Sequence, residues 1–199
     1  RALREDNPAA RGQRSDYDLN RGEKLEAFGG KKLRSAAVLV PIVDHADGAT
    51  VLLTKRTDHL SKHPGQISFP GGTVDPEDEN SIAAALRETH EEIGIESSYI
   101  RVAGFLDEYI TGTGFEIKPV VAIVEPGFSL VLQEAEVAEA FEVPLSFLLD
   151  RGNHRRESVM WQGVLRHYYA MPYEGYKIWG ATAAMLVNLC DVMEIGRER

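Results

Sequence analysis

The chain has 199 residues with a formal net charge of −9, and 43% of its residues are hydrophobic. This size and hydrophobic content are typical of one folded domain with its own core. The acidic balance excludes nucleic acid as the main partner, because a phosphate backbone requires a basic surface. No apolar run approaches the roughly 20 residues of a bilayer span, so no membrane partner is expected. The single cysteine, Cys190, excludes an intrachain disulfide and favours a reducing compartment, which predicts a cytoplasmic protein.

The N-terminal part of the chain differs in character from the rest. Residues 1–34 are polar, charged and weakly periodic, which predicts a loosely ordered arm with one short helix near residues 22–28. Residues 35–199 contain no repeat and no internal linker. They therefore predict a single domain that follows the arm.

The domain opens with two β-rich runs, at residues 36–43 and 50–55. The turn-forming residues 44–48 lie between them, so the two runs predict a hairpin. Pro41 lies inside the first run and has no backbone N–H. We therefore expect its strand at the edge of a sheet or at a bulge.

The later elements alternate between strands and helices. They are a helix at 80–93 that ends at Gly94, a strand pair at 100–109 and 116–124, a short helix at 144–150, a hairpin of 158–161 and 164–169, and a closing helix at 180–193. Strand pairs interrupted by helices predict an α/β domain in which helices cover both faces of a mixed sheet.

Three carboxylates mark one face of the helix predicted at residues 80–93. Glu88, Glu91 and Glu92 stand at positions i, i+3 and i+4, so their side chains share an arc of about 100°. The other face carries an apolar stripe that can pack on a core: Ile82, Ala85, Leu86, Thr89 and Ile93. Clustered carboxylates repel one another, and they are the ligands that Mg²⁺ and Mn²⁺ prefer. The alternative is an acidic helix surface that simply faces solvent.

These carboxylates belong to a longer pattern. It runs from Gly71-Gly72 through Glu79 to Arg87-Glu88-Thr89-His90-Glu91-Glu92-Ile93-Gly94-Ile95. The pattern resembles the Nudix box of hydrolases that split nucleoside diphosphates linked to another group. Six residues separate Gly72 from Glu79, one more than is usual, and Thr89 stands where an aliphatic residue is usual. The resemblance implies a Nudix-type α/β/α sandwich with a mixed sheet.

The longer spacing and a second motif resemble one branch of this family, the coenzyme A pyrophosphatases. The second motif comprises Leu52–Thr57 and Leu60–Gly72, and a further stretch, Ile178–Ala183, opens the last helix. Thr57 and Ser61 depart from the pattern of the branch. The resemblance covers most of the chain and implies hydrolysis of the diphosphate of coenzyme A or its acyl derivatives. The products would be phosphopantetheine and adenosine 3′,5′-bisphosphate.

The resemblance also implies roles within the box. Glu88, Glu91 and Glu92 are the implied ligands of Mg²⁺ or Mn²⁺. The turn at Gly71-Gly72 is small enough for the backbone to approach a phosphate or the metal, although a simple turn between strand and helix is the alternative. Arg87 is implied to brace the catalytic loop through an ion pair with Glu79. A surface pair of Arg87 with Glu91, four residues later, is the competing interpretation.

The remaining candidates lie outside the box. Lys55, Arg56, Lys62 and His63 are candidates for binding the phosphates of the substrate, although a loop histidine is often only solvated. The general base is left open between Glu88 itself and a downstream acid in the segment 134–139. We choose Glu136 from that segment; the alternative there is a solvated acidic turn.

The sequence therefore predicts a metal-dependent pyrophosphatase whose substrate is a small nucleoside diphosphate derivative, with coenzyme A favoured. Two alternatives stay open: a pyrophosphatase for ADP-ribose, NADH or a similar dinucleotide, and a non-catalytic Nudix-like sensor of a nucleotide. A sensor is expected to lose ligand carboxylates, whereas all three are present here. A homodimer, formed with a second copy of the chain, is the one macromolecular assembly that we leave open.

Overall fold

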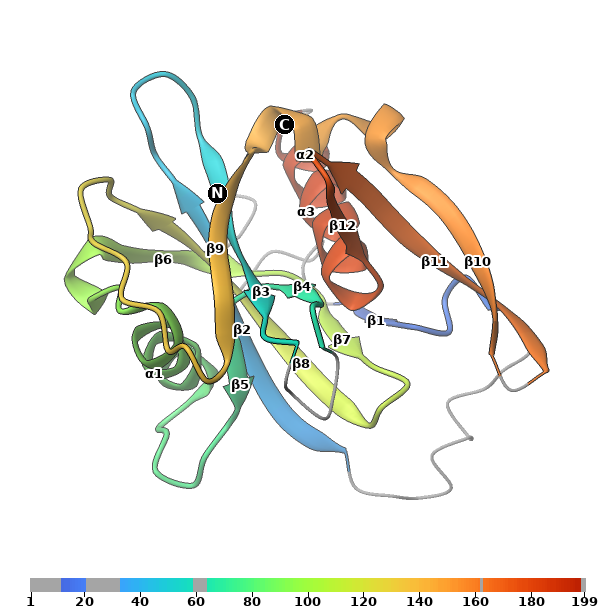
Figure 1. Ribbon diagram of the computed structural model, residues 1–199, viewed down its shortest axis with the longest axis horizontal. Helices are drawn as coiled ribbons and strands as arrows, with labels where there is room; N and C mark the ends of the chain where they lie inside the picture. The colour runs from blue at the N-terminus through green and yellow to red at the C-terminus, as the bar shows by residue number, and fades with distance from the viewer. Residues whose placement is uncertain (1–11, 21–32, 59–63, 162, 198–199) are drawn as a thin grey trace.

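The computed structural model describes residues 12–20, 33–58, 64–161 and 163–197 (Figure 1). The helix expected near residues 22–28, and the candidate residues Lys62 and His63, lie outside these ranges. Among the described helices, none is long and apolar enough to cross a membrane.

Nine strands of the described residues form one mixed sheet. Its continuous order is β1-β7-β8-β2-β3-β4, while β5 pairs with β2, β6 with β8 and β9 with β3. The bounds are β1 (Gln13–Ser15), β2 (Arg34–Val43), β3 (Thr50–Arg56), β4 (Ile67–Ser68), β5 (Gly71–Thr73), β6 (Ile100–Phe105), β7 (Glu108–Ile110), β8 (Phe115–Val124) and β9 (Val137–Pro144). A second, antiparallel sheet contains β10 (Arg155–Trp161), β11 (Val164–Tyr173) and β12 (Tyr176–Trp179).

The helices cover both faces of the large sheet, as Figure 1 shows. They are α1 (Ser81–Ile93), α2 (Leu145–Leu149) and α3 (Ala181–Arg197), with 3₁₀ turns η3 (Ser97–Tyr99) and η4 (Arg151–Asn153). α1 packs on one face and α2 and α3 pack on the other, with the three-stranded sheet beyond α3. The predicted α/β layered fold is confirmed, as are the three helices and the hairpins formed by β2 with β3 and by β10 with β11.

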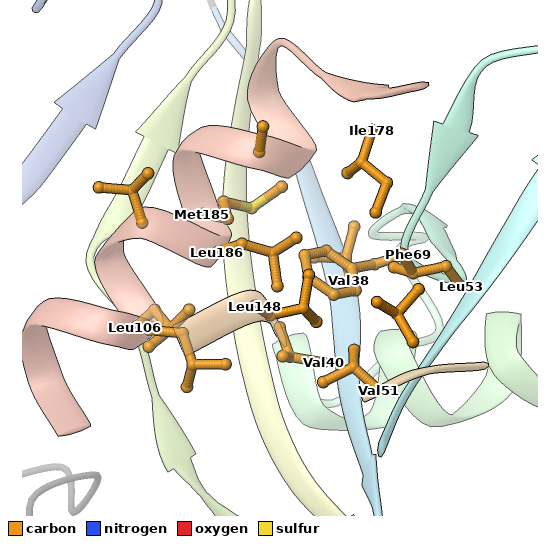
Figure 2. Packing of buried hydrophobic residues seen from close by; sticks show 14 of the residues in the cluster. Val38, Val40, Val51, Leu53, Phe69, Leu106, Leu148, Ile178, Met185 and Leu186 are labelled. Atoms are coloured by element: carbon orange, nitrogen blue, oxygen red, sulfur yellow. The ribbon is translucent and has the colours of Figure 1, made fainter. Parts of the chain in front are cut away.

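The strand β2 explains why the core has two halves. Its side chains alternate between the faces, so Val38 and Val40 pack toward α2 and α3, whereas Ala37 and Leu39 pack toward α1. Figure 2 shows the first half, in which Leu186 of α3 reaches the valines of the sheet. A strand buried on both faces reads as a continuous apolar run, which is the pattern of residues 36–43.

Pro41 does not mark an edge, and that prediction is wrong. β2 is a central strand that pairs with β8 throughout, including Pro41 opposite Ala122. The backbone N–H of Leu39 points to the opposite side, where it bonds to the carbonyl of Pro70 at 2.9 Å. Positions 39 and 41 are two residues apart, so a backbone N–H at either position would point to the same side of β2. On that side, residue 41 lies between the stretch of β2 that pairs with β5 and the stretch that pairs with β3. No ladder bond to β8 is therefore lost.

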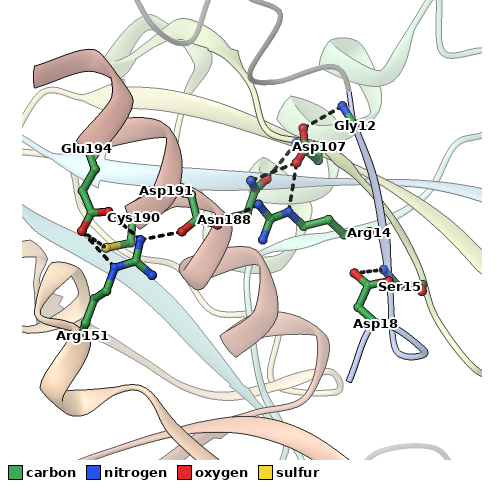
Figure 3. A network of polar contacts seen from close by, with 10 residues as sticks. All are labelled: Gly12, Arg14, Ser15, Asp18, Asp107, Arg151, Asn188, Cys190, Asp191 and Glu194. Atoms are coloured by element: carbon green, nitrogen blue, oxygen red, sulfur yellow. Dashed lines mark hydrogen bonds and ion pairs between the residues drawn. The ribbon is translucent and has the colours of Figure 1, made fainter. Parts of the chain in front are cut away.

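The N-terminal arm contains a strand of the main sheet. β1 pairs in parallel with β7, with Arg14 opposite Tyr109. The guanidinium of Arg14 donates to Asp107 at 3.0 Å and to Asp191 of α3 at 2.7 Å (Figure 3). Asp107 is buried and also accepts a bond from Asn188 at 3.1 Å. For residues 12–20 the expectation of loose order is therefore corrected, because buried polar contacts fix this stretch on the sheet and on α3.

Candidate active site

The position of α1 is set by both of its ends. The side chain of Asn80 accepts bonds from the backbone N–H groups of Ile82 at 2.9 Å and Ala83 at 3.0 Å, which satisfies two donors of the first turn. At the other end Gly94 adopts a left-handed conformation with φ 74° and closes the helix. The helix predicted from sequence is thus confirmed, and its acidic face is directed toward the glycine turn of β5.

Gly71 connects this turn to the helix. Its backbone N–H donates to Oε2 of Glu92 at 3.2 Å. Gly71 has φ 150°, and a Cβ atom there would lie 2.4 Å from the carbonyl oxygen of Ala37. A residue with a side chain would therefore collide with the backbone of β2, and only glycine allows this contact with Glu92.

Gly72 is needed for a different reason. A Cβ atom on Gly72 would lie 2.5 Å from the carboxyl carbon of Glu88. The carboxylate of Glu88 thus occupies the space that a side chain at position 72 would fill. The two glycines together allow Glu88 and Glu92 to lie against the backbone of the turn.

Burial and like charge perturb both carboxylates. Burial raises the pKa of Glu92 to about 7, although the N–H of Gly71 and the charge of Arg56 oppose this shift. The negative charges of Glu88 and Glu136 raise it further. Burial also raises the pKa of Glu88, against the opposing effect of Arg87 and with the charges of Glu91 and Glu136 adding to it. Glu88, Glu92 and Glu136 are therefore within electrostatic reach of one another.

Glu136 reaches this site through a loop that the fold holds against α1. The backbone N–H of Gln133 donates to the carbonyl of Glu92 at 2.9 Å, and that of Thr57 donates to the carbonyl of Glu136 at 3.0 Å. Glu136 itself is exposed, one residue before β9 begins. The sequence-based choice of Glu136 among the downstream acids thus points to a residue that lies beside Glu88 and Glu92.

Lys55 and Arg56 lie on opposite faces of the sheet. Leu52 and Val137, the register partner of Arg56, both belong to the core under α1, and strand alternation places Arg56 on that side. Its effect on the pKa of Glu92 agrees with this position. Lys55 shares the face of Leu53, which packs toward α3. Of these two predicted substrate-binding cations, the structure brings only Arg56 to the acidic cluster.

Arg87 does not pair with Glu79, and the predicted brace is corrected. Its guanidinium donates to both carboxylate oxygens of Asp78, at 3.0 and 2.8 Å, and to the carbonyl of Thr73 at 3.2 Å. It also donates to Glu88 at 3.0 Å and to Glu91 at 3.1 Å, so the competing surface pair is present as well. Glu79 is exposed and forms none of the ion pairs found among the described residues. The loop turns Asp78, rather than its neighbour, toward the helix.

Comparison with known proteins identifies the family of the chain. The sequence model of the NUDIX domain matches residues 33–162. A protein of Enterobacter sp. (strain 638) named "Uncharacterized Nudix hydrolase NudL" is 40% identical over 163 residues, which cover 82% of this chain and 83% of that protein. A protein of the same name from Yersinia pestis (strain Pestoides F) is 38% identical over 162 residues, 81% of each chain. The chain belongs to the Nudix hydrolase family.

Solved structures support the fold of this Nudix hydrolase. RenU, a Nudix hydrolase from M. smegmatis, aligns with a TM-score of 0.52 at 20% identity and covers 83% of this chain and 88% of its own. A MutT/nudix family protein from Enterococcus faecalis aligns with a TM-score of 0.51 at 16% identity, over 90% of this chain and 73% of its own. At these identities the likeness concerns the architecture alone.

Nudix hydrolases generally need divalent cations such as Mg²⁺. In the described part of this Nudix hydrolase, no three His, Cys, Asp or Glu side chains converge as a set of metal ligands. Arg87 instead binds the carboxylates of Glu91, at 3.1 Å, and of Glu88, at 3.0 Å. The chemistry of the donors nevertheless fits a hard cation, because Glu88, Glu92 and Glu136 supply only carboxylate oxygens, and the charge of Glu136 raises the pKa of both Glu88 and Glu92. The metal ligands thus remain a prediction.

Asp78 is the site residue that the sequence did not reveal. The box pattern points to the glutamate at 79, and nothing in the spacing shows which of two adjacent acids faces Arg87. A hint exists in the turn itself, since the N–H of Asp75 donates to Asp78 at 2.8 Å, a contact common where aspartate shapes a loop. Such local turn chemistry orients Asp78 inward in this Nudix hydrolase.

Proposed function

We propose that this Nudix hydrolase is a Mg²⁺- or Mn²⁺-dependent pyrophosphatase that hydrolyses coenzyme A or its acyl derivatives to phosphopantetheine and adenosine 3′,5′-bisphosphate. The observation that carries the proposal is the group of Glu88, Glu92 and Glu136 beside the glycine turn, with raised pKa values on the first two. The motif from Leu52 to Gly72, which resembles the coenzyme A branch, supports the choice of substrate.

The acidic cluster fits a reaction on a diphosphate only with cations present, because three carboxylates alone repel an anionic substrate. A bound divalent cation would neutralise phosphate oxygens and increase the acidity of the attacking water. Glu88, Glu91 and Glu92 are the proposed ligands. Binding requires Glu91 to leave Arg87, and its exposed side chain is free to turn.

The other residues have positioning and proton-transfer roles in the proposed reaction. The N–H of Gly71 holds one oxygen of Glu92, and Arg87 orients Glu88 through its bond at 3.0 Å. Glu136, exposed and adjacent to both carboxylates, is the proposed acceptor of the proton of the attacking water, with Glu88 as the alternative. The cleaved P–O bond releases one phosphate monoester on each side.

Arg56 and the glycine turn are the proposed contacts for the phosphates. Arg56 is a cation beside Glu92, where the diphosphate would lie for in-line attack. Gly71 and Gly72 are partly exposed, and their backbone lies against Glu88 and Glu92. Lys62 and His63, outside the described residues, stay predicted contacts, whereas Lys55 faces the other side of the sheet.

A substrate panel tests the proposal. Purified protein is incubated with Mg²⁺ or Mn²⁺ and coenzyme A, an acetyl thioester of it, dephospho-coenzyme A, ADP-ribose or NADH, and products are identified by mass spectrometry. We expect coenzyme A and its thioester to be turned over alike, with the highest kcat/KM. Equal kcat/KM for coenzyme A and ADP-ribose would favour the dinucleotide alternative. Binding without turnover in any metal would favour a sensor.

The ligand assignment has its own measurement, which is independent of turnover. Binding of Mn²⁺ is followed by electron paramagnetic resonance for the unmodified protein and for Glu88→Gln, Glu91→Gln and Glu92→Gln. Each ligand replacement should weaken Mn²⁺ binding by roughly 10- to 100-fold, since a carboxylate ligand becomes a neutral amide. Glu79→Gln is the matched control, because Glu79 is exposed and near the same helix. Unchanged Mn²⁺ affinity in the Glu92 variant would refute its role as a ligand.

A further inference from the structure

The hairpin of β10 and β11 exposes an unusual amount of apolar surface. Met160 is 63% exposed and Trp161 is 56% exposed, and they lie at the end of the hairpin. Further large apolar side chains on the same two strands are also exposed: Val159, Val164 and Leu165. Figure 1 shows this end of the hairpin extending past the body of the molecule. Apolar side chains that gather on one projecting element commonly mark an interaction site.

β10 is also an open edge of its sheet. β11 lies between β10 and β12, so one side of β10 has no partner strand among the described residues. An exposed apolar edge strand offers unpaired backbone groups for pairing with another chain. Six of its seven residues are exposed, and the guanidinium of Arg156 donates to the carbonyl of Leu19 at 3.1 Å.

The hydrogen-bond pattern shows which backbone groups of β10 face outward. In β11 the N–H and carbonyl of His167 bond to Asn20, and the carbonyl of Tyr169 accepts from Gly180, all on the side away from β10. The register partners of these β11 residues are Ser158 and Arg156. Because the backbone groups of His167 and Tyr169 face away from β10, these two register pairs are non-hydrogen-bonded pairs of the antiparallel ladder. The N–H and C=O groups of Arg156, Ser158 and, by the same parity, Met160 therefore point outward.

We propose that this edge is a homodimer interface, in which β10 pairs antiparallel with β10 of a second copy about a two-fold axis at Ser158. This register pairs Ser158 with itself and Arg156 with Met160 of the second copy, so all outward backbone groups find partners. Ser158 is the central residue of β10, so a two-fold axis there pairs all seven residues of the strand with residues of the second copy. The two small sheets then join into one continuous sheet across the axis.

The side chains favour a second copy as the occupant. Directly opposite residues share a face, so Arg155 lies opposite Trp161 of the second copy, and each guanidinium can stack on an indole. Glu157 lies opposite Val159, and no two like charges are directly opposed. Glu157 is moreover already neutralised by Lys177, at 2.7 Å, within its own chain. The strand is thus complementary to itself in this register.

The first test removes one outward donor. Proline is tolerated on an edge strand where the N–H faces outward, so Ser158→Pro should keep the fold while blocking the central pair of hydrogen bonds. Sedimentation equilibrium should show a dimer of the 22.1 kDa chain for the unmodified protein and a monomer for the variant. Circular dichroism checks the fold of both. A monomer of the unmodified protein at every concentration, or a folded Ser158→Pro dimer, would overturn the proposal.

The second test addresses the register and does not depend on proline. Trp161→Arg places a cation opposite Arg155 of the second copy and should raise the dimer dissociation constant by about 10-fold or more. Adding Arg155→Glu replaces the repulsion by attraction and should restore the dimer. Both residues are exposed, so the folded monomer does not depend on either. Failure of the double variant to regain affinity would contradict this register.

A disulfide gives the third test. Hydrogen-bonded antiparallel residues have Cα atoms about 5.5 Å apart, a distance that a disulfide can span. Ser158→Cys should therefore form a covalent dimer under mild oxidation, seen on a non-reducing gel. Asp47→Cys, in the exposed turn between β2 and β3, is the matched control and should stay monomeric. Cys190 is buried and contributes to neither. Equal cross-linking of the two variants would contradict the interface.

Discussion

Arg87 donates two hydrogen bonds to Asp78, at 3.0 and 2.8 Å, and the same guanidinium holds Glu88 at 3.0 Å. The pair therefore ties the loop that follows β5 to the acidic face of α1. Hydrogen bonds from Arg87 also lower the pKa of Asp78, so this carboxylate stays charged at neutral pH. A planar guanidinium that binds both oxygens of one carboxylate fixes orientation as well as distance.

The first prediction follows from this pair. Asp78→Ala should reduce kcat by about 100-fold, because Arg87 and with it Glu88 lose their fixed positions. Glu79→Ala should remain near the unmodified rate, since Glu79 is exposed and not bonded to Arg87. In a double-mutant cycle, Arg87→Ala should add little to Asp78→Ala and should be additive with Glu79→Ala. Coupling of Arg87 to Glu79 instead would show that the loop rearranges in the working enzyme.

The second prediction concerns the stability of the metal-free protein and its dependence on pH. Burial raises the pKa of Glu92 from 4.5 to about 7, so the folded state holds a proton that the unfolded chain releases between these values. Stability should therefore fall as pH rises from about 4.5 to 7, by an amount on the order of 3 kcal/mol at most. Urea unfolding at pH 5 and pH 8 measures this difference.

Glu92→Gln provides the control for that measurement. The glutamine keeps the shape of the side chain but does not titrate, so the fall in stability between pH 5 and pH 8 should shrink. At pH 8 without metal the variant should be at least as stable as the unmodified protein, because repulsion from Glu88 and Glu136 is relieved. An identical pH dependence in both proteins would show that Glu92 is not the titrating group.

The sequence predicted best where local rules decide the structure. α1 was predictable because Asn80, the apolar stripe and Gly94 each act within one or two helical turns. The same holds for Glu88 and Glu92, whose shared face follows from helix geometry. Pro41 was misjudged because its tolerance depends on which neighbour its missing N–H faces, a property of the assembled sheet. The strand β1 was missed because a polar run of three residues gains its stability from β7, Asp107 and α3.

The residues of the candidate site were likewise predictable only where local spacing decides their position. Residues within the box were found from their spacing, but the choice between Asp78 and Glu79 depends on a turn whose path no periodicity describes. Lys55 and Arg56 are neighbours in sequence, so both were predicted for one role. Strand alternation separates them, and which face each takes is decided by the core packing of the residues around them.

The third prediction uses the two glycines as a matched pair. Gly72→Ala meets only the flexible end of Glu88, so the fold should tolerate it while the carboxylate is displaced, with kcat falling by about 100-fold. Gly71→Ala meets the backbone of Ala37 at 2.4 Å and must adopt φ 150°, so it should destabilise the fold by about 1–3 kcal/mol or more. Thermal unfolding and turnover of both variants are compared. Equal loss of stability in the two would contradict the distinction.

The last prediction separates the two adjacent cations. Arg56 lies beside Glu92 on the face of α1, where the diphosphate would be cleaved, so Arg56→Ala should remove a charge-assisted contact with phosphate. Such a contact contributes around 1.5–3 kcal/mol, which corresponds to a loss of roughly 10- to 100-fold in kcat/KM for coenzyme A. Because the contact is with the diphosphate, dephospho-coenzyme A should show the same loss.

Lys55→Ala is the control for Arg56→Ala, with the same kind of truncation one residue away. Lys55 shares the face of Leu53 and has no access to the cluster from there, so kcat/KM should change by no more than about 3-fold. The two substrates distinguish the target of Arg56. A loss confined to coenzyme A would place the guanidinium on the 3′-phosphate instead of the diphosphate. A larger loss in Lys55→Ala than in Arg56→Ala would contradict the placement of the two side chains on opposite faces of β3, because only the residue that faces the carboxylates can stabilise the phosphates held there.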